Sequence, residues 1–124
     1  MSSPSSRRQS VAVEAAAILR EARAVIERRG WARGVSWDPR TGRVDILGAV
    51  AVAAGCSPKE TLTSPFPLAH APIARRVGAL TAWEALDATL DEDPVEWNDA
   101  LERTEQQVAH LLISVATILE ASAH

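Results

Sequence analysis

Three consecutive residues, Trp97-Asn98-Asp99, place an indole ring beside an amide and a carboxylate, a combination that could bind a ligand. In a functional interpretation, Asn98 and Asp99 face a cleft, and Trp97 forms a stacking wall for a small molecule or a peptide. In a structural interpretation, Trp97 anchors the segment on the core, and the two polar side chains hydrogen-bond to backbone amides of a turn before the last helix. We favour the structural interpretation, although both can hold together.

Other groups near this triplet could take part in the same chemistry. His110 precedes Ser114 by one helical turn, so a predicted helix presents a base beside a hydroxyl. No acidic residue at position 106, 107, 113 or 117 completes a catalytic triad locally, so we favour an ordinary half-exposed histidine and assign no catalytic residue. The candidate binding residues are Trp97, Asn98, Asp99, Arg103, His110 and Trp37, the last of which belongs to a predicted hairpin.

Metal and nucleotide sites have recognisable spacings that this chain lacks. The histidines, His70, His110 and His124, are far apart in the sequence. The acidic residues between positions 91 and 96 lack the glycine of a calcium-binding loop, and the glycines fit neither a P-loop nor a dinucleotide fingerprint. We therefore expect no metal and no cofactor.

The single cysteine and the apolar runs bear on the cellular compartment. Cys56 has no partner for an internal disulfide, which fits a reducing cytoplasm. It lies near a predicted helix N-terminus that could lower the pKa of its thiol, but without a nearby histidine we favour an unreactive cysteine. Residues 1–9 lack the apolar segment of a secretory signal and predict a disordered tail. The longest uncharged apolar run, residues 106–119, is shorter than the roughly 20 residues that span a bilayer. We expect a cytoplasmic protein with no membrane contact.

The formal net charge of −3 is unevenly distributed along the chain. Residues 84–105 hold nine acidic side chains against a single base, Arg103. This segment is either an acidic face for a basic partner or a solvated face that keeps the protein soluble. Nucleic acid would require a basic patch, and the arginines of the predicted first helix are interleaved with glutamates. We therefore do not expect nucleic acid to be the main partner.

The elements that position these groups are mostly helical. Apolar residues at three- and four-residue spacing predict helices over residues 10–29, 47–54, 68–90 and 104–122. The third is expected to be interrupted early by Pro72 and divided into two pieces near Gly78. Residues 57–60, 81–84 and 104–107 match capping boxes. Residues 37–43 are rich in turn formers, and short alternating segments at 34–37 and 43–46 predict a small β-hairpin around them. The last helix is apolar on more than one side, so it is either central to the core or half covered by a partner.

Several short motifs together resemble a known family. They are Arg29-Gly30-Trp31, residues 38–44, Leu47-Gly48-Ala49, Trp97-Asn98-Asp99, and Arg103-Thr104 followed by Val108. In these motifs the chain is similar, over about residues 12–118, to a family of short actinobacterial and phage proteins known only as a domain of unknown function. The resemblance implies a recurrent fold and a bacterial cytoplasmic setting, and no reaction. The family pattern often has a cysteine just before the Leu-Gly-Ala motif, where this chain has Asp45 and Ile46.

The sequence thus predicts a mainly α protein, with a single domain over residues 10–122 that contains four or five helices and a small β-hairpin between the first two. We expect a small non-catalytic accessory protein that binds a protein partner, or a second copy of itself, through its helical surface and the acidic segment 84–105. One alternative is a small-molecule-binding protein or enzyme with a pocket around Trp97, Asn98 and Asp99. A further alternative is a nucleic-acid-linked regulator that uses the arginine-rich first helix.

Overall fold

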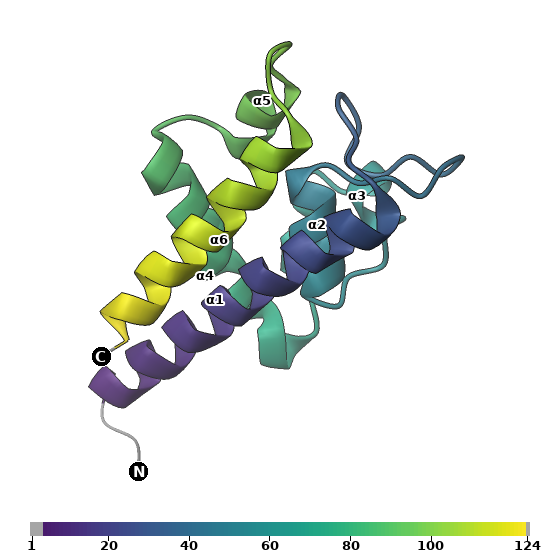
Figure 1. The fold of residues 1–124 in the computed structure, drawn as a ribbon. Helices are drawn as coiled ribbons and strands as arrows, with labels where there is room; N and C mark the ends of the chain where they lie inside the picture. Colours follow the sequence, from purple (N-terminus) through teal and green to yellow (C-terminus); the bar gives the residue numbers. More distant parts are fainter. Residues whose placement is uncertain (1–3, 124) are drawn as a thin grey trace.

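The computed structural model describes residues 4–123, which form six α-helices and one short 3-10 helix (Figure 1). The helices are α1 (Pro4–Arg29), α2 (Ile46–Ala53), α3 (Glu60–Thr63), η1 (Pro67–His70), α4 (Ile73–Leu90), α5 (Pro94–Asp99) and α6 (Glu105–Ser122). The mainly α prediction is confirmed, but the described residues form six α-helices rather than four or five, because the short helices α3 and α5 add to the four longer ones. Among the described helices, none is both long enough and apolar enough to cross a bilayer.

The core lies where α1 meets α6, α4 and α2. Helices α1 and α6 lie side by side and run in opposite directions (Figure 1). Many of the buried positions are alanines, which let helix backbones approach closely. The apolar stripe of α6 is therefore core, because its large side chains Val108, Leu112 and Val115 are fully buried.

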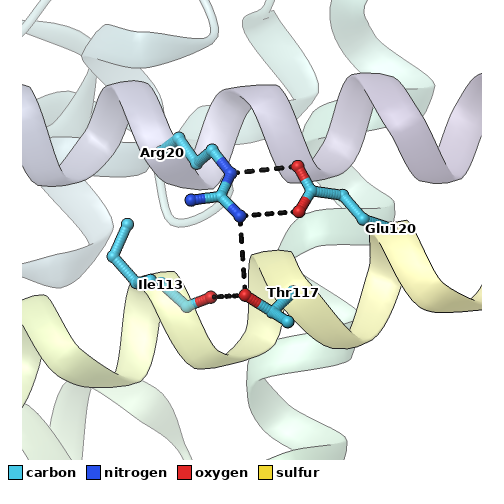
Figure 2. A network of polar contacts seen from close by, with 4 residues as sticks. All are labelled: Arg20, Ile113, Thr117 and Glu120. Carbon is cyan, nitrogen blue, oxygen red and sulfur yellow. Dashed lines mark hydrogen bonds and ion pairs between the residues drawn. The ribbon is translucent and has the colours of Figure 1, made fainter.

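A polar contact also joins α1 to α6 on the surface of the pair. Arg20 donates from Nε and Nη2 to the two carboxylate oxygens of Glu120, at 2.9 and 2.6 Å (Figure 2). Its Nη2 also lies 3.4 Å from the hydroxyl of Thr117, which in turn donates to the carbonyl of Ile113. This bidentate pair raises the pKa of Arg20 through the hydrogen bond to Glu120.

Helix α1 begins at Pro4, rather than at Ser10 after a disordered segment as we expected. Proline suits the first position of a helix, and residues 5–10 contain no helix breaker, so the packed part of α1 is continued toward its N-terminus. Residues 1–3 of the expected tail lie outside the described part of the chain.

The predicted β-hairpin between the first two helices is wrong. The connection holds only two isolated bridges, which pair Val44 with Trp31 in parallel and with Trp37 in antiparallel orientation. The amide of Val44 donates to the carbonyl of Gly30, and its carbonyl accepts from the amide of Ala32. Across the turn, the amides of Asp38 and Asp45 donate to the carbonyls of Arg43 and Ser36. Asp45 is already the N-cap of α2, so the pairing across the turn ends after a single bridge. The turn itself is present, with the amide of Gly42 donating to the carbonyl of Asp38 at 2.7 Å.

Two other predicted features differ in the structure. The capping box at residues 57–60 is not formed, since α3 begins only at Glu60 and its N-cap residue, Lys59, makes no side-chain cap. Helix α4 runs unbroken through Gly78 and through the capping box expected at residues 81–84, so the expected division there is wrong. The expected early interruption at Pro72 is confirmed, since α4 begins at Ile73. A Cβ atom at Gly78 would lie 2.9 Å from the side chain of Glu14, so this glycine serves the close packing of α4 on α1.

At the start of α6 the predicted capping box is confirmed, since the side chains of Thr104 and Gln107 each accept from the other's backbone amide.

Candidate functional site

The triplet Trp97-Asn98-Asp99 lies at the end of the short helix α5, rather than in a turn before the last helix. The carboxylate of Asp93 starts this helix by accepting from the amides of Val95 and Glu96, at 2.7 and 3.3 Å. A proline directly follows the aspartate at the first helical position. The helical backbone points Asn98 inward, toward the connection between α1 and α2.

Asn98 is fully buried, and both ends of its amide are hydrogen-bonded. Its oxygen accepts from the indole Nε1 of Trp31 at 2.7 Å and from the amide of Ile46 at 3.2 Å. Its nitrogen donates to the carbonyl of Ala32 and to the carboxylate of Asp99, at 3.2 and 3.0 Å. A side-chain amide has two donors and one oxygen that accepts two bonds, so its bonding capacity is filled. Asn98 therefore holds α5 to the α1–α2 connection and is not available to a ligand.

Asp99 serves the same connection. Its carboxylate accepts from the amide of Gly34 at 2.9 Å, in addition to the bond from Asn98. The structural interpretation of the two side chains thus fits the geometry, but their partners lie in residues 31–46 and not in the turn before α6.

A buried carboxylate that the sequence analysis missed lies beside these residues. Asp45 is the N-cap of α2 and accepts from the amide of Gly48 at 2.8 Å and from the hydroxyl of Ser36 at 3.2 Å. Burial raises its pKa to about 6, opposed by these two hydrogen bonds and assisted by the charge of Asp99. Its signal in the sequence is an aspartate directly before an apolar helical run, the usual pattern of a helix N-cap.

The other candidate residues near the triplet do come together, in an open groove of about 520 Å³. Trp97, Arg103 and His110 line this groove with Ser114 and Leu111. The guanidinium of Arg103 lies 3.9 Å from the centre of the Trp97 ring, and its Nε donates to the Trp97 carbonyl. Arg103 is thus held as a stacked cation over the indole. Asn98 and Asp99 are not among the residues that line the groove.

Trp37 lies apart from the other candidate residues. It belongs to the α1–α2 connection and packs, half-buried, against the core. Its indole nitrogen is buried and has no hydrogen-bond partner among the described residues. The structure therefore does not combine Trp37 with the groove at Trp97.

A second hollow, of about 290 Å³, is mostly apolar and was not expected. Its wall includes Leu47, Phe66, Leu80, Trp83 and Val95, with Asp93 also contributing. We call it the α4 notch. Phe66 is 75% exposed and Leu80 is 41% exposed, although both are large apolar residues. Four of the eight exposed large apolar side chains of the described residues, Phe66, Ile73, Val77 and Leu80, lie on α4 or just before it, whereas α6 exposes one, Ile118.

The histidines and the cysteine show no arrangement for metal binding or thiol chemistry. In the part of the chain that the structure describes, no group of three or more potential ligand side chains could hold a metal ion. His70 is exposed, with Nε2 3.1 Å from the hydroxyl of Ser64, and His124 lies outside the described residues. Burial raises the pKa of the Cys56 thiol, contrary to the lowering that a helix N-terminus could have produced.

The comparisons with known proteins add a family and no activity. No curated protein and no solved structure matches the chain. A family described as a family of unknown function, DUF6197, matches residues 10–118, which is most of the chain and includes both the polar cluster at Asn98 and the groove at Trp97. The chain therefore belongs to this family of unknown function, DUF6197.

Proposed function

We propose that this protein is a small non-catalytic accessory protein of the cytoplasm that acts by binding a protein partner. The observation that carries the proposal is a row of exposed apolar side chains on α4. Ile73, Val77 and Leu80 recur at helical spacing, and the first two are 82% and 60% exposed. Apolar side chains scattered singly over a surface are ordinary, but a contiguous row beside an apolar hollow is typical of a binding surface.

The acidic segment supports the same proposal. Eight of its carboxylates are exposed, and within residues 4–123 none of the eight forms an ion pair. They are Glu84, Asp87, Asp91, Glu92, Asp93, Glu96, Glu102 and Glu105. Unpaired surface charge of one sign steers association with a partner of opposite charge and adds specificity.

The groove at Trp97 favours a second candidate function, the binding of a small molecule. Arg103 is stacked over Trp97, and His110 lines the same groove, so a cation, an aromatic face and an imidazole meet there. A planar anionic ligand would suit these groups. The function would then depend on Trp97, Arg103 and His110, without Asn98 and Asp99.

Affinity capture of the tagged full chain from its host, followed by native mass spectrometry, tests the proposal. We expect a stoichiometric protein partner, or a second copy of the chain, that is lost when Ile73→Asp and Val77→Asp are combined. The matched control is Leu101→Asp, because Leu101 is 89% exposed and lies outside α4. A monomer that carries no protein would overturn the proposal, and a bound small molecule would favour the groove at Trp97.

A further inference from the structure

One side of α4 changes its chemistry halfway along the helix. Ile73, Val77, Leu80, Glu84 and Asp87 follow one another at spacings of four and three residues, which places them on a single face. The first three are apolar and the last two are acidic, and all five are exposed. At a rise of about 1.5 Å per residue, this stripe is roughly 20 Å long.

The α4 notch opens beside the middle of this stripe. Leu80 belongs to both, and Trp83, one turn further along the helix, lines the notch with it. Phe66, Leu47 and Val95 complete the apolar wall, which therefore combines four segments of the chain. The notch is at the lower limit of the roughly 300–1,000 Å³ that small-molecule sites occupy, so it suits one bulky apolar side chain.

The charged side chain that lines the notch and the two that continue the stripe are all acidic. Asp93 contributes to the notch itself, while Glu84 and Asp87 continue the stripe from Leu80 toward the end of α4. No described cation forms an ion pair with these three carboxylates. A partner that brought Lys or Arg to this position would gain attraction along the whole acidic half of the stripe.

We propose that this face of α4 binds an amphipathic, basic segment of a partner protein. This proposal rests on the proposed function and names the partner's chemistry. The segment inserts a large apolar side chain into the α4 notch, covers Ile73 and Val77 with further apolar residues, and places Lys or Arg opposite Glu84 and Asp87. A helix laid along α4 satisfies these requirements, since its own apolar and charged residues recur at the same three- and four-residue spacing.

A second copy of the chain fits the same face poorly. In a two-fold pairing of this stripe, the acidic half of one copy meets either the acidic half or the apolar half of the other. The first arrangement brings like charges together, and the second buries carboxylates against apolar residues without a cation. Acidic surfaces such as nucleic acid or anionic lipid are repelled by the same carboxylates.

The proposal is tested by selecting binders from a displayed library of random 16-residue peptides on the immobilised full chain. We expect enriched sequences that combine bulky apolar residues at helical spacing with at least two Lys or Arg. The synthetic consensus peptide is then titrated against variants by calorimetry. Leu80→Asp should raise its Kd tenfold or more, and Asp87→Lys should raise it severalfold, with the larger effect at low salt.

Two matched variants control for nonspecific effects of surface charge. Leu101→Asp and Glu27→Lys make comparable changes at exposed positions outside α4, and both should leave the Kd within about twofold of the unchanged chain. Thermal melts of all four variants confirm that each is folded. Enriched peptides without basic residues, no enrichment, or a Kd that is insensitive to Leu80→Asp and Asp87→Lys would overturn the proposal.

The two proposals can fail separately. A natural partner that is captured equally well by the Leu80→Asp and Asp87→Lys chains would leave the interaction function standing and overturn this binding face. A homodimer that dissociates on Val77→Asp would show that the occupant is a second copy, which also overturns the basic-segment proposal.

Discussion

Asn98 is the residue whose surroundings most clearly separate structure from chemistry. Its amide lies in the core with four hydrogen bonds, three of which reach residues 31–46. A side chain whose bonding capacity is filled by the protein holds an architecture in place, and it has no capacity left for a ligand. The neighbouring Trp97, by contrast, lines an open groove with Arg103. The triplet is thus divided between two roles at adjacent positions.

Removal of the buried side-chain amide of Asn98 should strongly destabilise the folded protein. We expect Asn98→Ala to lower the free energy of unfolding by about 3 kcal/mol, because it leaves the indole N–H of Trp31 and the carbonyl of Ala32 without partners in the core. Urea denaturation measures the change. Gln106→Ala removes an exposed amide and should cost less than about 0.5 kcal/mol. Equal effects of the two substitutions would contradict the anchoring role.

Asp45 should make stability depend on pH. Its pKa is about 6 in the folded protein against an ordinary value of 3.8, so the folded state binds the proton more tightly than the unfolded chain does. The protonated form of Asp45 therefore stabilises the folded state relative to the ionised form, by on the order of 3 kcal/mol. This contribution to the free energy of unfolding is complete below the unfolded pKa and is lost as pH rises through about 6.

Asp45→Asn isolates this contribution. Asparagine keeps an oxygen that can accept from the amide of Gly48, but it does not titrate. The difference in free energy of unfolding between the variant and the unchanged chain should grow between pH 4 and pH 6, in favour of the variant, as measured by urea denaturation at several pH values. Parallel curves for the two chains would show that Asp45 does not titrate in this range.

At the scale of the elements, the start of α2 depends on a close approach between backbones. A Cβ atom at Gly48 would lie 2.0 Å from the carbonyl oxygen of Ser36, which cannot move aside without displacing the α1–α2 connection. We expect Gly48→Ala to lower the free energy of unfolding by on the order of 3 kcal/mol. The midpoint of thermal denaturation, compared between the variant and the unchanged chain, measures this loss of stability. An unchanged midpoint would mean that the connection shifts freely.

The start of α6 offers a milder test of a local signal. Thr104→Ala removes the hydroxyl that accepts from the amide of Gln107, and should lower the free energy of unfolding by about 1 kcal/mol. Thr104→Ser keeps the hydroxyl and serves as the control. If both substitutions had the same effect in chemical denaturation, the cap would not contribute to stability.

At the scale of the whole molecule, the distribution of charge separates the candidate partners. Half of the six arginines of α1 are neutralised within the described residues, since Arg20, Arg23 and Arg28 pair with glutamates. Within the described residues, the acidic side chains from α4 to the start of α6 form no ion pairs. A field of this kind attracts a basic protein segment and opposes contact with phosphates.

Chromatography tests the nucleic-acid alternative directly. We expect the protein to pass through a heparin column at about 0.1 M salt, because the paired arginines of α1 present no continuous basic patch. Retention that falls steeply with added salt would instead support the arginine-rich first helix as a nucleic-acid surface. An anion-exchange column run in the same buffer, which should retain the chain, is the control.

Several features could be predicted from the sequence because their signals are local. The capping residues Thr104 and Gln107 place the start of the last helix within one residue of its position in the structure. The turn at residues 38–42 follows from Asp38 and Gly42. The hairpin prediction failed because α2 begins directly after Asp45, its N-cap, which leaves room for a single bridge between Val44 and Trp37. The expected break at Gly78 failed because α1 packs Glu14 against that glycine.

The sequence by itself determined the helical class, the bounds of α2 and α6 to within one residue, and the membership of a family. The helix signals depend on residues within a few positions of one another, and the family match compares the chain position by position. Only the tertiary structure decided that Asn98 meets Trp31, 67 positions away, that Asp45 is buried, and that Phe66 and Leu80 share one notch. The reason is physical. Helical periodicity and caps act over one or two turns, whereas the burial of a polar group or the exposure of an apolar one is set by elements that are remote in sequence and meet only when the core packs.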